Sequence, residues 1–172
     1  LSGLISGNTV HTMERVTQRL EYLNLSFIAQ SPLRILVLQI DDYQNFQSRY
    51  NPRERWAYRY AVTNLVSEIT KEEIQSVVFS QDSDKFVMLV DDTSLSQKQP
   101  EKELEALLEK IRDSFRQHLE LSISVAYSDP FDNVVHIARE YEKLMDLLQL
   151  RVKYGFGCLL KPCLLEEQEY GS

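Results

Sequence analysis

The sequence has few of the residues that form flexible loops or cross-links. Glycine and proline each occur only five times in 172 residues, which argues against a disordered or loop-rich chain. The two cysteines, Cys158 and Cys163, lie near the C-terminus with no histidine nearby, so we expect reduced thiols and no structural zinc site. No apolar run approaches the ~20 residues that span a bilayer, and no signal peptide is visible. These absences predict a cytoplasmic domain without a membrane-inserted segment.

Basic residues are also in short supply. The chain has 26 acidic and 19 basic residues, for a formal net charge of −7. A domain that binds nucleic acid through its phosphates normally carries a basic face, and this sequence has no long run of lysine and arginine. We therefore expect no direct nucleic-acid binding by this chain. Its hydrophobic content of 43% is that of an ordinary globular domain. Because the chain starts at Leu1, we expect it to be a piece of a longer protein.

Apolar periodicity predicts alternating helices and strands in the first half of the chain. Residues 10–23 carry an apolar side chain every three or four positions, which is typical of an amphipathic helix. Residues 33–40 are almost continuously apolar, which suits a strand covered on both faces. Residues 51–70 open with Asn-Pro, a favourable helix start, and continue with a helical pattern. Two short strands should follow at 76–80 and 85–90, joined by a polar turn at 81–84.

The second half continues in the same way. Residues 104–115 form the clearest amphipathic helix, and residues 121–127 have the composition of a strand. Asp132 is a suitable cap for a long final helix, with Val152 at the end of its apolar face. A short strand at 158–161 would complete the sheet.

This order predicts an α+β fold in the order β-α-β-β-α-β-α, with helices packed on a sheet and an additional N-terminal helix. The predicted division is an N-terminal segment with the amphipathic helix at 1–30, the main domain at 31–165 and a polar tail at 166–172.

Three short motifs give this order a more specific meaning. The first strand ends in Gln39-Ile40-Asp41-Asp42-Tyr43, the predicted hairpin contains Asp82-Ser83-Asp84-Lys85-Phe86, and a later strand contains Ser124-Val125-Ala126. With them, residues 33–161 resemble a GGDEF domain, the fold of bacterial diguanylate cyclases. In active members the corresponding motifs are Asp-x-Asp-x-Phe, Gly-Gly-Asp/Glu-Glu-Phe and Ser-x-Gly. The resemblance implies a nucleotidyl-cyclase-like sheet.

The whole chain more specifically resembles the middle region of some AraC-type bacterial transcription regulators. In these, a degenerate GGDEF-like segment lies between an N-terminal signalling module and a C-terminal helix-turn-helix pair. The residues that carry this resemblance are 4–7, 20–25, 40–43, 55–69 and 141–157. It implies a non-catalytic regulatory domain, of the kind found in two-component signalling, that links signal input to DNA-binding output by dimerisation or domain docking. Its expected partners are the upstream signalling module, the downstream helix-turn-helix and a second copy of the chain.

The resemblance also locates a vestigial cyclase site, formed by Gln39, Asp41, Gln47, Asp82, Ser83, Asp84 and Lys85. Hard cations such as Mg²⁺ need carboxylate ligands, and Gln39 stands where active members have a metal-binding Asp. Asp82 and Ser83 replace the signature glycines, and Lys85 replaces a Glu. Gln47 stands in place of the guanine-reading Asn, whereas Asp84 keeps its signature position. We therefore expect no enzyme activity, no catalytic residues, no metal and no cofactor.

Several alternatives stay open. The cyclase pocket could serve as a sensor that binds a nucleotide or metabolite, with Lys85 contacting an anionic ligand. The carboxylates of the site, with Asp42, could hold a cation or could simply be solvated turn residues. Trp56, Tyr58 and Tyr60 could form an interaction face, although alternate residues of a helix point apart. A cyclase of a related type is the third function, and Gln39 counts against it equally.

Overall fold

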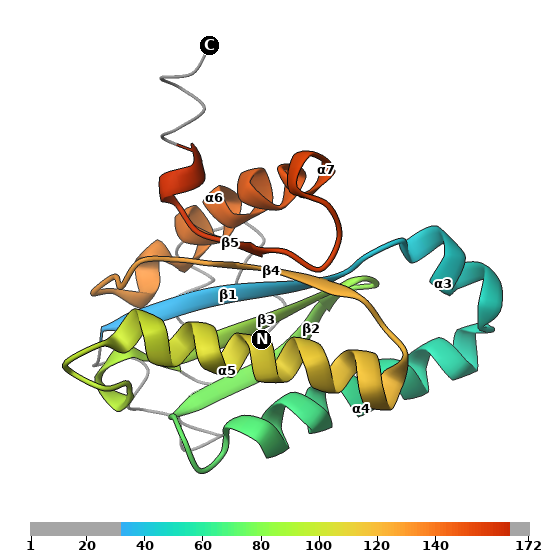
Figure 1. The fold of residues 1–172 in the computed structure, drawn as a ribbon, viewed down its shortest axis with the longest axis horizontal. Coiled ribbons are helices and arrows are strands. Elements are labelled where there is room, and N and C mark those ends of the chain that lie inside the picture. The colour runs from blue at the N-terminus through green and yellow to red at the C-terminus, as the bar shows by residue number, and fades with distance from the viewer. Residues whose placement is uncertain (1–31, 166–172) are drawn as a thin grey trace.

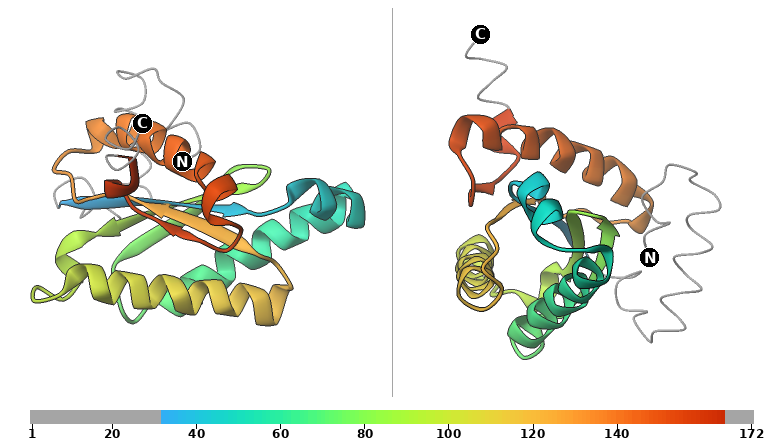
Figure 2. Two further views of the ribbon diagram at one scale, coloured as in Figure 1. Left: turned by 45° about the horizontal axis from the view of Figure 1, so that its top comes forward. Right: turned by 90° about the vertical axis from the view of Figure 1, so that its right-hand side faces the viewer.

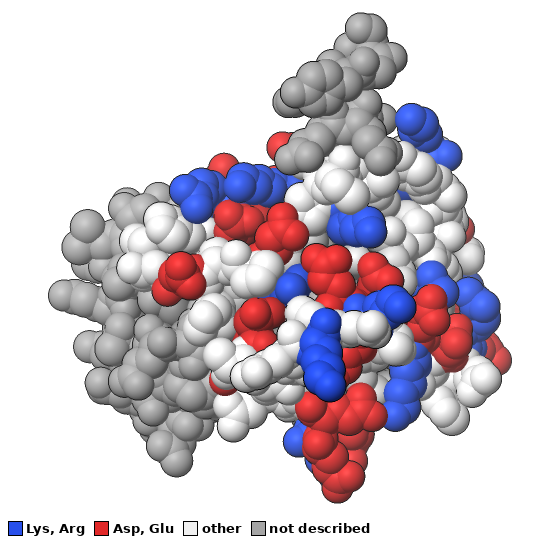
Figure 3. Space-filling model, turned by 60° about the vertical axis from the view of Figure 1, so that its left-hand side comes forward, with Lys and Arg blue, Asp and Glu red and all other residues white. Residues whose placement is uncertain are grey.

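The computed structural model describes residues 32–165. The helix expected within residues 10–23 and the polar tail at 166–172 therefore lie outside the described residues. None of the described helices is long and apolar enough to cross a membrane. On the face shown in Figure 3, acidic and basic side chains are interspersed.

The centre of the fold is a five-stranded sheet in the order β2-β3-β1-β4-β5 (Figure 1). The strands are β1 (Leu33–Ile40), β2 (Ser76–Asp82), β3 (Lys85–Asp91), β4 (Ile123–Tyr127) and β5 (Leu159–Leu160). β1 is antiparallel to both β3 and β4, and β4 is parallel to β5. All eight residues of β1 are buried, which confirms the strand covered on both faces.

Helices cover the two faces of this sheet. The described α-helices are α3 (Tyr43–Arg49), which lies beyond one end of the sheet (Figure 1), α4 (Pro52–Thr70), α5 (Pro100–Ser114), α6 (Ile137–Gln149) and the short α7 (Arg151–Tyr154). Figure 2 shows α4 and α5 on one face and α6 on the other. The side chains of β1 alternate between the two cores: Leu36 and Leu38 pack with α4 and α5, and Ile35 and Val37 pack with α6. The mixed α+β architecture predicted from the sequence is confirmed.

The start of α4 follows the sequence closely. Glu54 N donates to Asn51 Oδ1 at 2.9 Å, and Asn51 N donates to Glu54 Oε2 at 2.8 Å. This reciprocal capping box, with Pro52 in the first turn, satisfies backbone donors that have no partner within the helix. The separate helix α3 was not predicted. It begins after Asp42, whose left-handed backbone (φ 49°) turns the chain out of β1.

The hairpin between β2 and β3 is tighter than predicted. Asp82 pairs with Lys85 across the hairpin, so only Ser83 and Asp84 form the loop instead of the expected tetrapeptide. Asp82 Oδ1 accepts the backbone N–H of Ser83 at 2.8 Å, which folds the turn locally. An irregularity between Ser80 and Asp82 absorbs the change in register.

The final helix also differs from the prediction. Asp132 does not cap it; instead Asn133 Oδ1 accepts the N–H of Val135 at 3.0 Å and starts a 3₁₀ turn that leads into α6. α6 ends at Gln149, and Val152 lies in the separate α7 with 91% of its surface exposed. The helical pattern of apolar residues in the sequence therefore continues beyond the last residue of α6 that packs in the core.

Candidate functional site

The end of β1 and the β2–β3 hairpin form a compact polar cluster. Gln39 lies opposite Lys85 in the β1–β3 ladder, so the strand register brings it to the hairpin loop. Gln39 Nε2 donates to Asp84 Oδ2 at 2.9 Å, and Lys85 Nζ lies 3.0 Å from Asp84 Oδ1. Lys85 Nζ also lies 3.7 Å from Asp82 Oδ2. With Ser83, whose backbone N–H donates to Asp82, the structure brings together five of the seven site residues, and both oxygens of the Asp84 carboxylate have partners within the protein.

The electrostatics of this hairpin cluster follow from its contacts. The Ser83 backbone N–H lowers the pKa of Asp82 below its usual value, and Lys85 acts in the same direction while burial opposes both. Burial raises the pKa of the Tyr141 phenol on α6. The charges of the hairpin cluster act on this phenol as well, so α6 brings Tyr141 close to the hairpin.

Asp41 belongs to a different cluster. Its side chain is fully buried and accepts hydrogen bonds from Ser122 Oγ at 2.7 Å and Ser124 Oγ at 2.8 Å. Gly157 N donates to it at 2.9 Å, and Arg151 Nη1 forms an ion pair with it at 3.2 Å. Asp41 therefore joins the end of β1 to β4 and to the segment around α7, and its carboxylate bonds to these groups and not to the residues of the hairpin cluster.

Gln47, the last of the seven site residues, lies exposed on α3, and its backbone oxygen accepts from Arg55 Nη1 at 3.1 Å. Asp42 is exposed at the start of α3, and Ser83 is half-buried in the loop. Within residues 32–165, no group of three or more His, Cys, Asp or Glu side chains is arranged to hold a metal ion. Figure 1 shows α3 and the β2–β3 hairpin at the same end of the sheet.

Sequence reasoning missed the residues that surround Asp41 and the hairpin from the C-terminal part of the chain. Arg151 and Gly157 lie 110 and 116 residues after Asp41, and no local pattern marks either as its partner. Tyr141 was predicted only as part of the apolar face of a helix. For Ser124 there was a signal, since it opens the Ser-Val-Ala motif of the later strand.

Fold and site together define a class of protein: an α+β domain whose central antiparallel strands carry a polar hairpin at one end, as in the nucleotidyl-cyclase-like sheet. A family model described as "GGDEF-like domain" matches residues 6–150. The chain belongs to the GGDEF-like domain family.

Solved structures agree with this assignment. The chain is similar to the active GGEEF domain of a diguanylate cyclase from Vibrio cholerae, with 14% identity, a TM-score of 0.60 and coverage of 84% of this chain and 87% of that chain. An EAL/GGDEF domain protein from M. capsulatus gives 13% identity, a TM-score of 0.58 and coverage of 81% of this chain and 92% of that chain. The GGDEF domain of DgcB from Caulobacter crescentus, described in complex with c-di-GMP, gives 12% identity, a TM-score of 0.54 and coverage of 88% of this chain and 89% of that chain. At these identities the likeness is one of fold. No relative is found among curated proteins.

These similarities correct the expectation that the chain is not an enzyme. That expectation is contradicted, because one structure with this fold is described as the active GGEEF domain of a diguanylate cyclase, and another is a GGDEF domain described in complex with c-di-GMP. It rested on single substitutions at positions such as Gln39 and Lys85, while β1, β3 and the hairpin between β2 and β3 are all present. Substituted residues on an intact scaffold do not by themselves exclude catalysis.

Proposed function

We propose that this GGDEF-like domain is a signalling module of an AraC-type bacterial transcription regulator, where it links signal input to DNA-binding output by domain docking or dimerisation. Its partners in this proposal are an upstream signalling module, a downstream helix-turn-helix pair and a second copy of the chain. The observation that carries the proposal is an exposed aromatic pair on α4.

This pair consists of Trp56 and Tyr60. Their rings are stacked at 6.2 Å with 10° between the planes, and the two residues are 66% and 61% exposed. Tryptophan and tyrosine are enriched at protein–protein interfaces and in the hot spots that dominate binding energy. Tyr58, the third aromatic residue considered from the sequence, is half-buried and hydrogen-bonded to Tyr50. The interaction face is therefore limited to Trp56 and Tyr60.

A double substitution tests this role in the full-length protein that contains the chain. We expect Trp56→Ser with Tyr60→Ser to lower signal-dependent activation of a reporter promoter by about tenfold, as expected for the loss of an interface hot spot. DNA binding by the isolated output domain should not change. Val152→Ser removes another exposed apolar side chain and is the matched control. Normal activation by the double variant, or a parent chain without a helix-turn-helix, contradicts the proposal.

A second candidate function is nucleotide binding at the hairpin cluster. The described complex of the DgcB GGDEF domain with c-di-GMP favours it, together with the position of Lys85 beside the loop. Calorimetry with GTP and c-di-GMP, with and without Mg²⁺, measures binding, and the same samples report turnover of GTP. We expect Lys85→Met to weaken binding by about tenfold, and Lys110→Met, an exposed lysine elsewhere, to leave it unchanged. Equal binding by both variants, or none by the unsubstituted chain, contradicts this function.

A further inference from the structure

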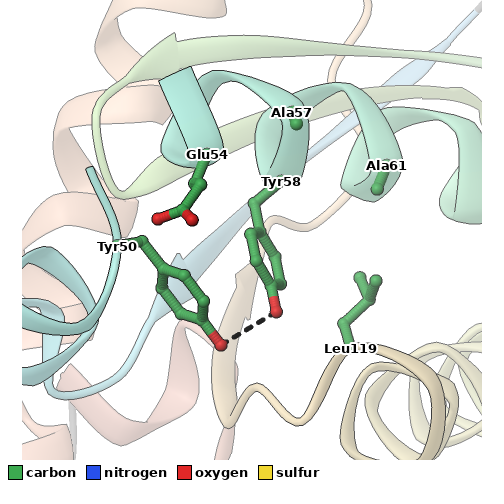
Figure 4. Close-up of a pocket in the computed structure, with 6 residues that line it drawn as sticks. All are labelled: Tyr50, Glu54, Ala57, Tyr58, Ala61 and Leu119. Carbon is green, nitrogen blue, oxygen red and sulfur yellow. Dashed lines mark hydrogen bonds between the residues drawn. The ribbon is translucent and has the colours of Figure 1, made fainter. Parts of the chain in front are cut away.

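A cavity of about 360 Å³ lies between the start of α4 and the π-helical turn η3 (Phe115–Leu119) that follows α5. Its lining residues are Tyr50, Glu54, Ala57, Tyr58, Ala61 and Leu119 (Figure 4). The site is distinct from the hairpin cluster, none of whose residues line it. It is also distinct from the Trp56–Tyr60 pair, which belongs to another part of the α4 surface. Its volume is near the lower end of the range of small-molecule sites, so it suits a small ligand.

Two aromatic rings form a preset wall of this cavity. Tyr58 Oη donates to Tyr50 Oη at 2.9 Å, and the ring centroids lie 4.6 Å apart. Phe46 supports both rings at 5.2 Å and 5.5 Å, and its own side chain is buried. The hydrogen bond with Tyr50 is the main cause that raises the pKa of Tyr58 to about 12, so the Tyr58 phenol stays neutral at physiological pH. Rings held in this way need little reorganisation to receive a ligand.

The charged side chain that lines the cavity is an exposed carboxylate. Glu54 is the charged residue of the lining; its Oε2 accepts from Asn51, and Figure 4 shows the carboxylate above the Tyr50 ring. A second carboxylate, Glu120, contributes to the raised pKa of Tyr58, and the Arg49 guanidinium acts on this pKa in the opposite direction. The Arg49 guanidinium lies over the Tyr50 ring at 5.5 Å, and Arg55 Nη1 donates to the Tyr50 carbonyl oxygen. Neither arginine lines the cavity.

The π-helical turn ends beside the cavity. Glu120, immediately after the lining residue Leu119, is the C-cap of this turn and adopts the left-handed conformation (φ 53°) in which helices often end. Across the cavity from Leu119, Ala57 and Ala61 of α4 line it with small side chains, which leave its space open.

We propose that this cavity binds a small organic cation, an ammonium group carried on an apolar or aromatic body. Aromatic faces attract cations through their electron-rich rings, and a neighbouring carboxylate adds charge complementarity. The apolar body lies against Leu119 and the two alanines, and the ammonium group lies between Glu54 and the tyrosine rings. This inference concerns a separate site and does not depend on the proposed function.

Binding is tested with benzyltrimethylammonium as the probe and 3-phenylpropanol as a neutral molecule of similar size. Methyl signals of Ala57, Ala61 and Leu119 in NMR spectra of the chain report occupancy and location. We expect the cation to shift these signals in a saturable way, and the neutral molecule to bind at least about tenfold more weakly. Glu54→Gln removes the charge but keeps an oxygen that can accept from Asn51, so the capping box survives. It should weaken binding of the cation by about tenfold.

A second variant and two controls distinguish binding that needs the space of the cavity from binding that needs only the charge of Glu54. Ala57→Leu fills the cavity from an exposed helical position and should abolish the shifts at Ala61 and Leu119. Glu68→Gln on the same helix and Ala106→Leu on α5 are exposed substitutions away from the cavity and should bind as the unsubstituted chain does. Circular dichroism confirms that each variant is folded. The inference is overturned if the cation causes no shifts at millimolar concentration, if the neutral molecule binds equally well, or if Ala57→Leu binds normally.

Discussion

Replacing Asp41 with asparagine should lower the free energy of unfolding by about 3 kcal/mol, the cost of breaking a buried ion pair from one side. The Asp41 side chain has no exposed surface, and four groups donate to it: two serine hydroxyls, the backbone N–H of Gly157 and the guanidinium of Arg151. Asparagine keeps the shape but removes the charge and presents an NH₂ group to these donors. Arg151 then keeps its charge without its partner, which is the costly half of the substitution.

Urea unfolding measures this loss, and hydrogen exchange locates it. Because Asp41 holds Arg151 and Gly157 against β1 and β4, faster exchange should appear first in residues 151–160. Asp42→Asn is the matched control, since Asp42 is exposed and asparagine tolerates its left-handed backbone. We expect its effect to be within about 0.5 kcal/mol. An equal effect of the two substitutions would show that the contacts of Asp41 do not hold the segment.

The elements of this fold could be predicted where a residue's neighbours along the chain decide its structure. The apolar run of β1, the Asn51-Pro52 start of α4 and the apolar stripe of α5 all carry their signal locally. The limits of elements were less well predicted. Val152 continues the helical periodicity but is exposed beyond the core, so the apolar pattern alone does not mark where α6 ends.

The candidate site shows the same division. Gln39 and the hairpin residues could be brought together from the sequence, because the resemblance fixes which strands pair. Asp41 is only two residues after Gln39, immediately beyond the end of β1, yet its partners lie 81 to 116 residues away and hold it in another cluster. The inference against catalysis failed for a related reason. It treated substituted residues as decisive, whereas the scaffold that they belong to is that of cyclase domains.

Phe86 is the residue whose truncation should most directly test how the hairpin is held on the sheet. Phe86 follows Lys85 in β3, pairs with Leu38 of β1 and Ser80 of β2, and is completely buried in the core beneath α4 and α5. We expect Phe86→Ala to lower the free energy of unfolding by about 4 kcal/mol, because a large side chain is lost and the rigid sheet cannot close the cavity.

A more conservative substitution of Phe86 and a control at an exposed phenylalanine are compared with Phe86→Ala. Phe86→Leu keeps much of the volume and should cost about 1.5 kcal/mol, while Phe156→Ala, at an exposed position, should stay within about 0.5 kcal/mol. Urea unfolding followed by circular dichroism compares the three. Because Phe86 and Lys85 are adjacent, a destabilised Phe86→Ala hairpin should also loosen the contacts of Lys85 with Asp82 and Asp84, seen as faster hydrogen exchange at Ser83. A cost below about 1 kcal/mol for Phe86→Ala would instead mean that the hairpin, and the polar cluster on it, is anchored by its backbone ladder alone.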